Sequence, residues 1–186
     1  MSVVFAVCPW IVYAIASSFT PVATAALISG AAALLLIGLR LTRGVRLAET
    51  TIDSATAAFF LAAALCSAAT GSDPVGRFIG AGCELWLALV VAAGLAIGRP
   101  FTEPIARRQA PAEFSATPAF RAFNTVITRA WLVSFLVAGL LILVSVGAFG
   151  PAGRYATYVL IPLSILIPVR YTAHLVRKVR FDAAPV

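Results

Sequence analysis

The sequence predicts an all-α, polytopic integral membrane protein with six transmembrane helices and both termini in the cytoplasm. Three observations support this prediction. Hydrophobic residues make up 61% of the 186 residues, and charged residues make up only 11%. A soluble domain of this size has too little interior to bury so many apolar side chains. In addition, twelve of the fourteen Lys and Arg residues fall in alternate loops between apolar segments, as in membrane proteins whose basic loops stay in the cytoplasm.

Six apolar segments approach the length needed to cross a bilayer, which is about 20 residues for a helix. The predicted spans cover residues 3–18, 22–39, 54–70, 78–98, 124–149 and 155–174. No basic region precedes the first segment and no small-residue cleavage site follows it, so we expect a span rather than a cleaved signal peptide. The chain, residues 1–186, is thus predicted to form a single helical domain, with an amphipathic cytoplasmic connector at residues 99–123.

The basic residues predict the orientation of these spans. Twelve of them lie after the second span, around the start of the fifth and at the end of the sixth, whereas the opposite loops carry only Arg77 and Arg154. Cytoplasmic loops collect Lys and Arg, so the larger set is expected in the cytoplasm. This band faces anionic lipid headgroups, which explains the net charge of +7 without a nucleic-acid partner. We therefore expect a multi-pass protein of the bacterial plasma (inner) membrane.

Two helix starts are predicted within the connector. Thr102 supplies a capping hydroxyl and Glu103 an acid in the first turn of a short helix, which ends by Pro111. A second helix begins at Thr117–Pro118 and enters the membrane as the fifth span, carrying Asn124 near its start. The polar residues of this stretch predict a site at the cytoplasmic mouth of the bundle.

The first of these helices is expected to lie in the membrane interface. Its apolar residues, Phe101 and Ile105, would contact lipid, while Arg107 and Arg108 would contact phosphate groups. The alternative interpretation is an ordinary amphipathic connector that binds no ligand.

Glu84 is the only acidic residue well inside a predicted span, on its outer-leaflet side. An ionisable group at such depth is costly and usually faces protein or water, which makes it a functional candidate. The alternative is a structural role, in which Glu84 is protonated or hydrogen-bonded and pairs with a hydroxyl or with Arg77 or Arg154. Arg129 and Arg170 lie near the cytoplasmic ends of the fifth and sixth spans, where they either extend to headgroups or line a pathway.

No catalytic, cofactor-binding or metal-binding residues are predicted. His174 is the only histidine and Lys178 the only lysine. A bis-histidine haem within one chain and a retinal Schiff base inside the membrane are therefore excluded. The three cysteines have no CxxC spacing, and the motifs of serine hydrolases, zinc proteases and phosphate-binding loops are absent.

One segment resembles a known family. The stretch GRPFTEPIARRQAP, followed by FSATPAFRAFNTVITRAWLVSF, spans most of residues 98–135. It resembles small bacterial multi-span proteins of the intracellular septation protein A type, with Pro118, Asn124 and Trp131 at matching positions. The resemblance implies a partner-binding membrane protein that acts in envelope organisation or cell division.

These observations lead to one main functional hypothesis. It is a non-enzymatic bacterial plasma-membrane protein that acts through lipid or protein partners, as a homo-oligomer or with another membrane protein. Three alternatives remain open. They are a small channel or transporter with Glu84 as its ionisable site, an accessory subunit of a larger membrane complex, and a membrane enzyme acting on lipid headgroups at residues 102–108.

Overall fold

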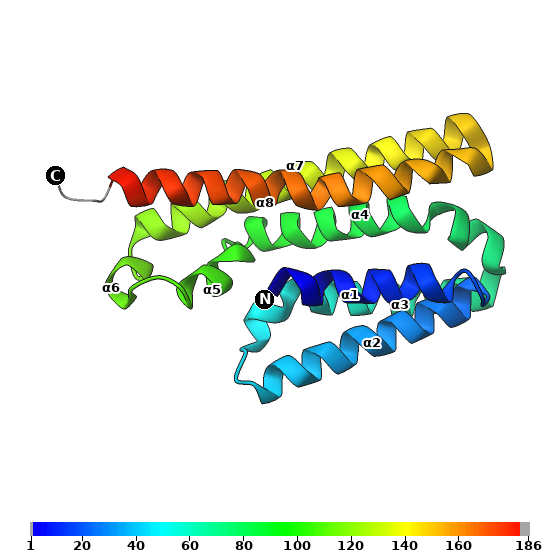
Figure 1. Ribbon diagram of the computed structural model, residues 1–186, viewed down its shortest axis with the longest axis horizontal. Helices are drawn as coiled ribbons and strands as arrows, with labels where there is room; N and C mark the ends of the chain where they lie inside the picture. Colours follow the sequence, from blue (N-terminus) through cyan, green and yellow to red (C-terminus); the bar gives the residue numbers. More distant parts are fainter. Residues whose placement is uncertain (1, 183–186) are drawn as a thin grey trace.

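The computed structural model describes the backbone of residues 2–182 and the side chains of residues 8–71 and 75–178, and this part of the chain contains helices and no strand (Figure 1). The long helices are α1 (Ser2–Ala16), α2 (Val22–Thr42), α3 (Thr51–Thr70), α4 (Ser72–Ala96), α7 (Pro118–Phe149) and α8 (Ala156–Asp182). The short helices are η1 (Leu47–Thr50), α5 (Thr102–Arg107), α6 (Ala112–Ser115) and η2 (Gly150–Tyr155). The predicted all-α class is confirmed.

Four helical segments in the described chain are long and apolar enough to cross a membrane, where six spans were predicted. They are Val22–Thr42, Leu47–Thr70, Val75–Ala96 and Pro118–Lys178. The last segment contains α7, η2 and α8, and it folds back at η2 so that α7 and α8 lie side by side. The 15 residues of α1 extend only about 22 Å at 1.5 Å per residue, less than the roughly 30 Å of hydrocarbon in a bilayer.

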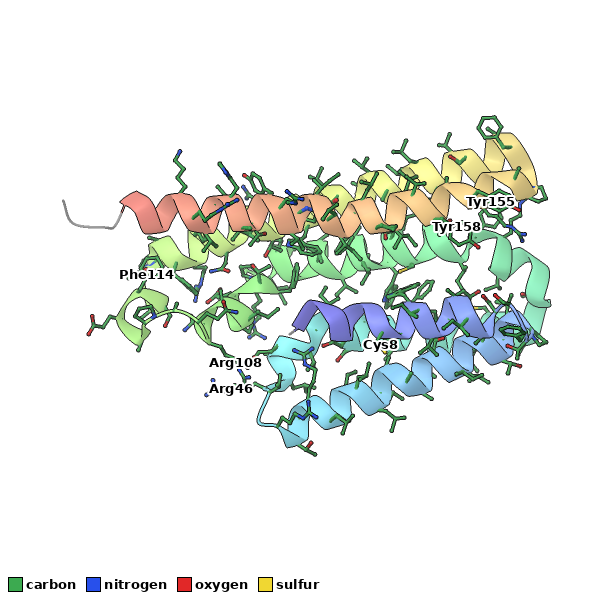
Figure 2. The ribbon with its side chains drawn as sticks, viewed as in Figure 1. Cys8, Arg46, Arg108, Phe114, Tyr155 and Tyr158 are labelled. Carbon is green, nitrogen blue, oxygen red and sulfur yellow. The ribbon has the colours of Figure 1, made fainter. Side chains whose placement is uncertain are left out.

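Consecutive long helices alternate in direction, so their connections gather at two ends of the bundle (Figure 1). One end holds the start of α1, the loop between α2 and α3, the helices α5 and α6, and the end of α8. We term it the arginine-rich end. The opposite end holds the turns after α1, α3 and α7, with Tyr155 and Tyr158 exposed there (Figure 2). This arrangement brings the predicted basic loops together in space.

The observed helices extend beyond the predicted spans at polar ends. α3 begins at Thr51 rather than at residue 54, and α4 covers Ser72–Ala96 rather than 78–98. α7 begins at Pro118, six residues before the predicted span and where the sequence predicted the helix start. Hydropathy marks only the apolar part of a helix, whereas backbone hydrogen bonding continues through polar turns. As a consequence, Glu84 lies at the middle of α4, about 18 Å from either end.

Small residues allow the helix pairs to pack closely. Buried alanines fill the contact between α2 and α3, among them Ala26, Ala33 and Ala57. At the contact between α4 and α7, a Cβ on Gly139 would lie 2.9 Å from the Leu85 side chain and 3.1 Å from Glu84 Cβ. The close approach of α4 and α7 therefore depends on the missing side chain of Gly139.

Large apolar side chains remain exposed on the outward faces of the long helices. Leu35 of α2, Leu65 of α3 and Val144 of α7 are each at least 65% exposed. Water-soluble proteins rarely leave contiguous apolar surface of this extent, whereas lipid tails solvate it without cost. The outer surface is therefore suited to a bilayer.

Candidate functional site

A pocket of about 770 Å³ opens at the arginine-rich end, between the α2–α3 loop, the end of α4 and the helix α5. We term it the arginine pocket. Its charged lining consists of Arg46, Arg99, Arg107, Arg108, Arg121, Glu49 and Glu103. Figure 2 labels Arg46 and Arg108 at this end. Five arginines against two glutamates make the lining electropositive, which favours anions.

Glu49 holds one side of the arginine pocket in place. Its side chain is only 5% exposed, and its Oε2 lies 2.6 Å from Arg108 Nε. Its Oε1 accepts a hydrogen bond of 3.2 Å from the backbone N–H of Arg46, and Arg108 Nη2 donates to the carbonyl of Gly44. This carboxylate therefore fastens α5 to the α2–α3 loop and fixes the direction of the Arg108 guanidinium.

Glu103 holds the other side of the pocket. Its Oε1 accepts from Arg107 Nη2 at 2.7 Å and from Arg107 Nε at 3.2 Å. Its Oε2 lies 3.7 Å from Arg121 Nε. Arg46 and Arg99 have no side-chain carboxylate partner within the described part of the chain. These two arginines therefore provide unbalanced positive charge in the pocket.

Thr102 fastens α5 to α7, and neither it nor Asn124 lines the pocket. Thr102 is the first residue of α5 and makes no capping bond, so the predicted capping role is wrong. Its hydroxyl donates to the carbonyl of Asn124 at 3.1 Å and shares a 2.8 Å hydrogen bond with Thr128 Oγ1. Asn124 Nδ2 donates to the carbonyl of Phe120, and its buried Oδ1 has no partner among the described residues. The hydroxyl that does cap is Thr117 Oγ1, which accepts from Phe120 N at the start of α7.

The expectation that Phe101 and Ile105 contact lipid is wrong. Phe101 packs edge-to-face on Trp131, with ring centroids 6.0 Å apart, and Ile105 is half-buried. Both side chains line a cavity inside the bundle. The apolar face of α5 folds over the aromatic residues between the ends of α4 and α7, because that surface buries it more completely than the membrane interface would.

This second hollow, which we term the Glu84 cavity, has a volume of about 160 Å³. Its walls come from α1, α2, η1, α3, α4, α5, α7 and α8, and they include Trp10, Trp131 and Phe135. It shares Glu49, Thr51 and Phe101 with the lining of the arginine pocket. The two hollows are therefore neighbours, one at the end of the bundle and one within it.

Glu84 lies in the wall of this cavity and is only 2% exposed. Its Oε1 accepts from the hydroxyl of Ser164 in α8 at 3.0 Å, while its Oε2 has no partner among the described residues. The same hydroxyl also lies 2.8 Å from the carbonyl of Ile161. Because one hydroxyl carries one proton, Ser164 only partly satisfies the carboxyl group. Of the predicted structural partners, the hydroxyl is present, and Arg77 instead donates to the carbonyl of Val146.

An ion pair between Arg40 and Asp53 forms part of the cavity wall. The two side chains are 15% and 11% exposed, and Arg40 Nη2 also lies 3.5 Å from the carbonyl of Glu49. Asp53 therefore balances the positive charge of Arg40, which makes no ion pair with Glu84. This pair joins the end of α2 to the first turn of α3.

The structure separates the predicted site residues into four groups. Glu103, Arg107 and Arg108 line the arginine pocket, whereas Glu84 lines the inner cavity. Thr102 connects α5 to α7, in part through the backbone carbonyl of Asn124. Arg129 and Arg170 are exposed on α7 and α8 and line neither hollow.

Sequence reasoning missed Arg40, Glu49, Asp53 and Ser164. Glu49 and Asp53 lie between the second and third predicted spans, where only the arginines were considered. A signal for Glu49 was its position three residues after Arg46, where a carboxylate can accept the backbone N–H at the start of a helix. Nothing in the sequence pointed to Ser164 as the partner of Glu84.

Within the described residues, no three His, Cys, Asp or Glu side chains gather closely enough to hold a metal ion. Comparisons with protein-family models, curated proteins and solved structures find no match to this chain. The functional argument therefore depends on the two hollows and their charges.

Proposed function

We propose that this chain is a six-span protein of the bacterial inner membrane with both termini in the cytoplasm. The number of six spans is reached when α7 and α8 are counted separately and α1 is added as a short first span. The concentration of Lys and Arg at the arginine-rich end supports the orientation, because cytoplasmic loops collect basic residues. Local thinning of the bilayer around α1 would accommodate its 15 residues.

Its proposed function is to bind an anionic lipid headgroup in the arginine pocket, and so to act through lipid and protein partners. The observation that carries this proposal is the pair of buried glutamates, Glu49 and Glu103, which orient three arginines around one pocket. Arginines held in this way are suited to the oxygens of a phosphate group. We favour a lipid as the source, because the pocket lies at the end of an apolar bundle and Val90 and Ile97 also line it.

Lipid retention in native mass spectrometry tests this proposal. The double variant Arg46→Gln/Arg99→Gln removes two pocket charges without separating a glutamate from its arginine. Arg43→Gln/Arg177→Gln is the matched control, because both residues are exposed at the same end and neither lines the pocket. We expect the pocket double variant to retain phosphatidylglycerol at least tenfold less than the control, with phosphatidylcholine retained equally by both.

Two results would contradict the lipid proposal. Equal retention of phosphatidylglycerol by the two double variants would mean that the pocket does not select the lipid. Tight binding of glycerol 3-phosphate or inorganic phosphate in calorimetry, without retention of phosphatidylglycerol, would assign the pocket to a soluble anion.

The resemblance to septation protein A supports a proposed role in envelope organisation or cell division. In that role a protein partner would bind near residues 98–135, which include α5 and α6. Deletion of the gene, followed by measurement of cell length, tests this role. Cells of unchanged length and envelope integrity would contradict it.

A small transporter is the second candidate function, and one observation favours it. Glu84 lies in the wall of a cavity that shares Glu49, Thr51 and Phe101 with the lining of the arginine pocket, so an ionisable group at the middle of α4 lies next to a pocket at the end of the bundle. Proteoliposome flux in Glu84→Gln, compared with Glu113→Gln on the exposed helix α6, tests this candidate. Equal flux in the two variants would remove Glu84 from the mechanism.

A further inference from the structure

The arginine pocket contains two separate groups of arginines, each next to its own glutamate. Glu49 of η1 binds the guanidinium of Arg108, with Oε2 2.6 Å from Nε. Glu103 of α5 binds Arg107 at 2.7 Å and lies 3.7 Å from Arg121. Among the described residues, no ion pair joins either glutamate to the arginines of the other. We term the two groups the Glu49 side, with Arg46 and Arg108, and the Glu103 side, with Arg107 and Arg121.

Both sides keep N–H donors that are accessible from the pocket. Within the described part of the chain, Nη1 of Arg107 and Nη1 of Arg108 make no hydrogen bond, and both side chains are 46% exposed. The side chain of Arg121 is 64% exposed. A guanidinium has five N–H donors in one plane, so a carboxylate on one edge leaves the other donors for a second acceptor. Each side can therefore bind an anion while its glutamate stays in place.

The charge and the volume of the pocket both exceed what a single phosphodiester requires. Five arginines and two glutamates leave three positive charges in the lining, whereas a phosphodiester carries one negative charge. The volume is about 770 Å³, within the range of roughly 300–1,000 Å³ for pockets that enclose drug-sized molecules. A headgroup with two phosphates balances more of this charge and occupies both sides.

We propose that the arginine pocket selects a lipid headgroup with two phosphodiester groups joined by a short polar linker. This inference rests on the proposed binding of an anionic lipid and names the class of that lipid. One phosphate binds the arginines of the Glu49 side, and the other binds the arginines of the Glu103 side. Because the two sides face each other across the pocket, separated phosphates fit them better than the adjacent phosphates of a diphosphate ester.

A comparison of three lipids on the unmodified full chain, by native mass spectrometry, tests this proposal. Cardiolipin has two phosphodiesters joined by one glycerol, and phosphatidylglycerol has one phosphodiester. Phosphatidic acid has one phosphate monoester, which carries a charge of about −1.5 to −2 near pH 7. It therefore comes close to cardiolipin in charge but has half the phosphates. We expect one cardiolipin per chain, retained at least tenfold more than either of the other lipids.

Two single variants test the two sides of the pocket separately. Arg46→Gln changes the Glu49 side and Arg121→Gln changes the Glu103 side. Both glutamates keep an arginine partner in each variant, so the unfolding temperature should stay the same. Each variant should reduce the preference for cardiolipin over phosphatidylglycerol at least threefold, because one phosphate loses a donor. Arg43→Gln, at an exposed residue outside the pocket, should keep the full preference.

Three results would overturn the inference. Equal retention of cardiolipin and phosphatidic acid would mean that the pocket selects charge and not the number of phosphates. An unchanged preference in both single variants would mean that the two sides do not bind one phosphate each. Tight binding of the deacylated headgroup of cardiolipin in calorimetry, without retention of cardiolipin, would assign the pocket to a soluble anion with two phosphates.

The same measurements separate this inference from the proposed function. If the retention of phosphatidylglycerol depends on Arg46 and Arg99 while cardiolipin has no advantage, the pocket binds a lipid and only the inference about its headgroup is wrong. If the retention of neither lipid depends on these two arginines, both the inference and the proposed function are wrong.

Discussion

The arginine pocket and the Glu84 cavity adjoin one another but differ in the sign of their unbalanced groups and in their exposure. The pocket is wide and lies at the end of the bundle, and its arginines are partly exposed, with Arg108 46% and Arg121 64% exposed in their side chains. The cavity is small and lies within the bundle, and its carboxyl group is almost fully buried. The pocket therefore has an excess of donors, whereas the cavity has an acceptor without a donor.

The difference shows how burial controls which charges are balanced within the protein. Near the end of the bundle, water and headgroups screen an unpaired guanidinium such as Arg99 at little cost. Inside the bundle no water or headgroup screens a charge, so the same imbalance is expensive there. The Arg40–Asp53 pair lies between these two environments.

The largest expected effect is at this boundary. Asp53→Asn leaves Arg40 mostly buried without its carboxylate partner, and removing one member of a buried pair typically costs about 3–5 kcal/mol. We expect a loss of about 3 kcal/mol in the free energy of unfolding, measured by titrating the protein with sodium dodecyl sulfate in mixed micelles. Arg40→Gln/Asp53→Asn should regain part of this loss, since neither charge is then left alone. If Asp53→Asn were as stable as Glu113→Gln, a variant on an exposed helix, the Arg40–Asp53 pair would not contribute to stability as a buried pair.

A smaller effect is expected at the contact between α4 and α7. Gly139→Ala places a Cβ against Leu85 and Glu84 Cβ at distances below those of normal packing, so the Leu85 side chain or the two helices must shift. Overpacking of this kind costs about 1–3 kcal/mol. Gly147→Ala is the matched control on the same helix, because a Cβ there meets no atom within 4 Å. The same detergent titration measures both variants, and equal stability would contradict the close α4–α7 contact.

A third effect, of about 1 kcal/mol, is expected where α5 joins α7. Thr102→Val removes the hydrogen bonds to Asn124 O and Thr128 Oγ1, and a hydrogen bond typically contributes about 1 kcal/mol. Thr125→Val is the control, because its hydroxyl bonds only within its own helix. Faster amide hydrogen exchange across α5 in Thr102→Val, with no change in Thr125→Val, would support the connection. Unchanged exchange would mean that Glu49 and Glu103 alone hold α5.

The sequence predicted the features that depend on local composition. Apolar runs located the long helices, and the alternation of arginines placed the basic loops at one end. Thr117 and Pro118 also located the start of α7, because capping and proline geometry act within a single turn. What local pattern cannot give is the distance between residues far apart in the chain.

The two hollows depend on such distant contacts. Arg108 meets Glu49 across 59 positions of sequence, and Ser164 meets Glu84 across 80. The lipid-facing assignment of Phe101 failed for the same reason, since the amphipathic pattern of α5 is the same whether its apolar face meets lipid or Trp131. Glu84 was identified because a single buried carboxyl in an apolar helix is conspicuous without knowledge of its neighbours.

The smallest effect on stability is expected at the exposed ion pair between Arg121 and Glu103. Arg121 lies 3.7 Å from Glu103, and its side chain is 64% exposed, so water and salt screen this pair. Exposed ion pairs contribute about 0–1 kcal/mol. Arg121→Gln should therefore leave the detergent titration unchanged while reducing retention of phosphatidylglycerol, because the charge still contributes to the field in the pocket. The reduction should be smaller than in Arg46→Gln/Arg99→Gln and should disappear at high salt, where the Debye length falls to about 3 Å. A loss of stability in Arg121→Gln as large as that of Asp53→Asn would mean that the Arg121–Glu103 pair is no more screened than the Arg40–Asp53 pair, in spite of its greater exposure.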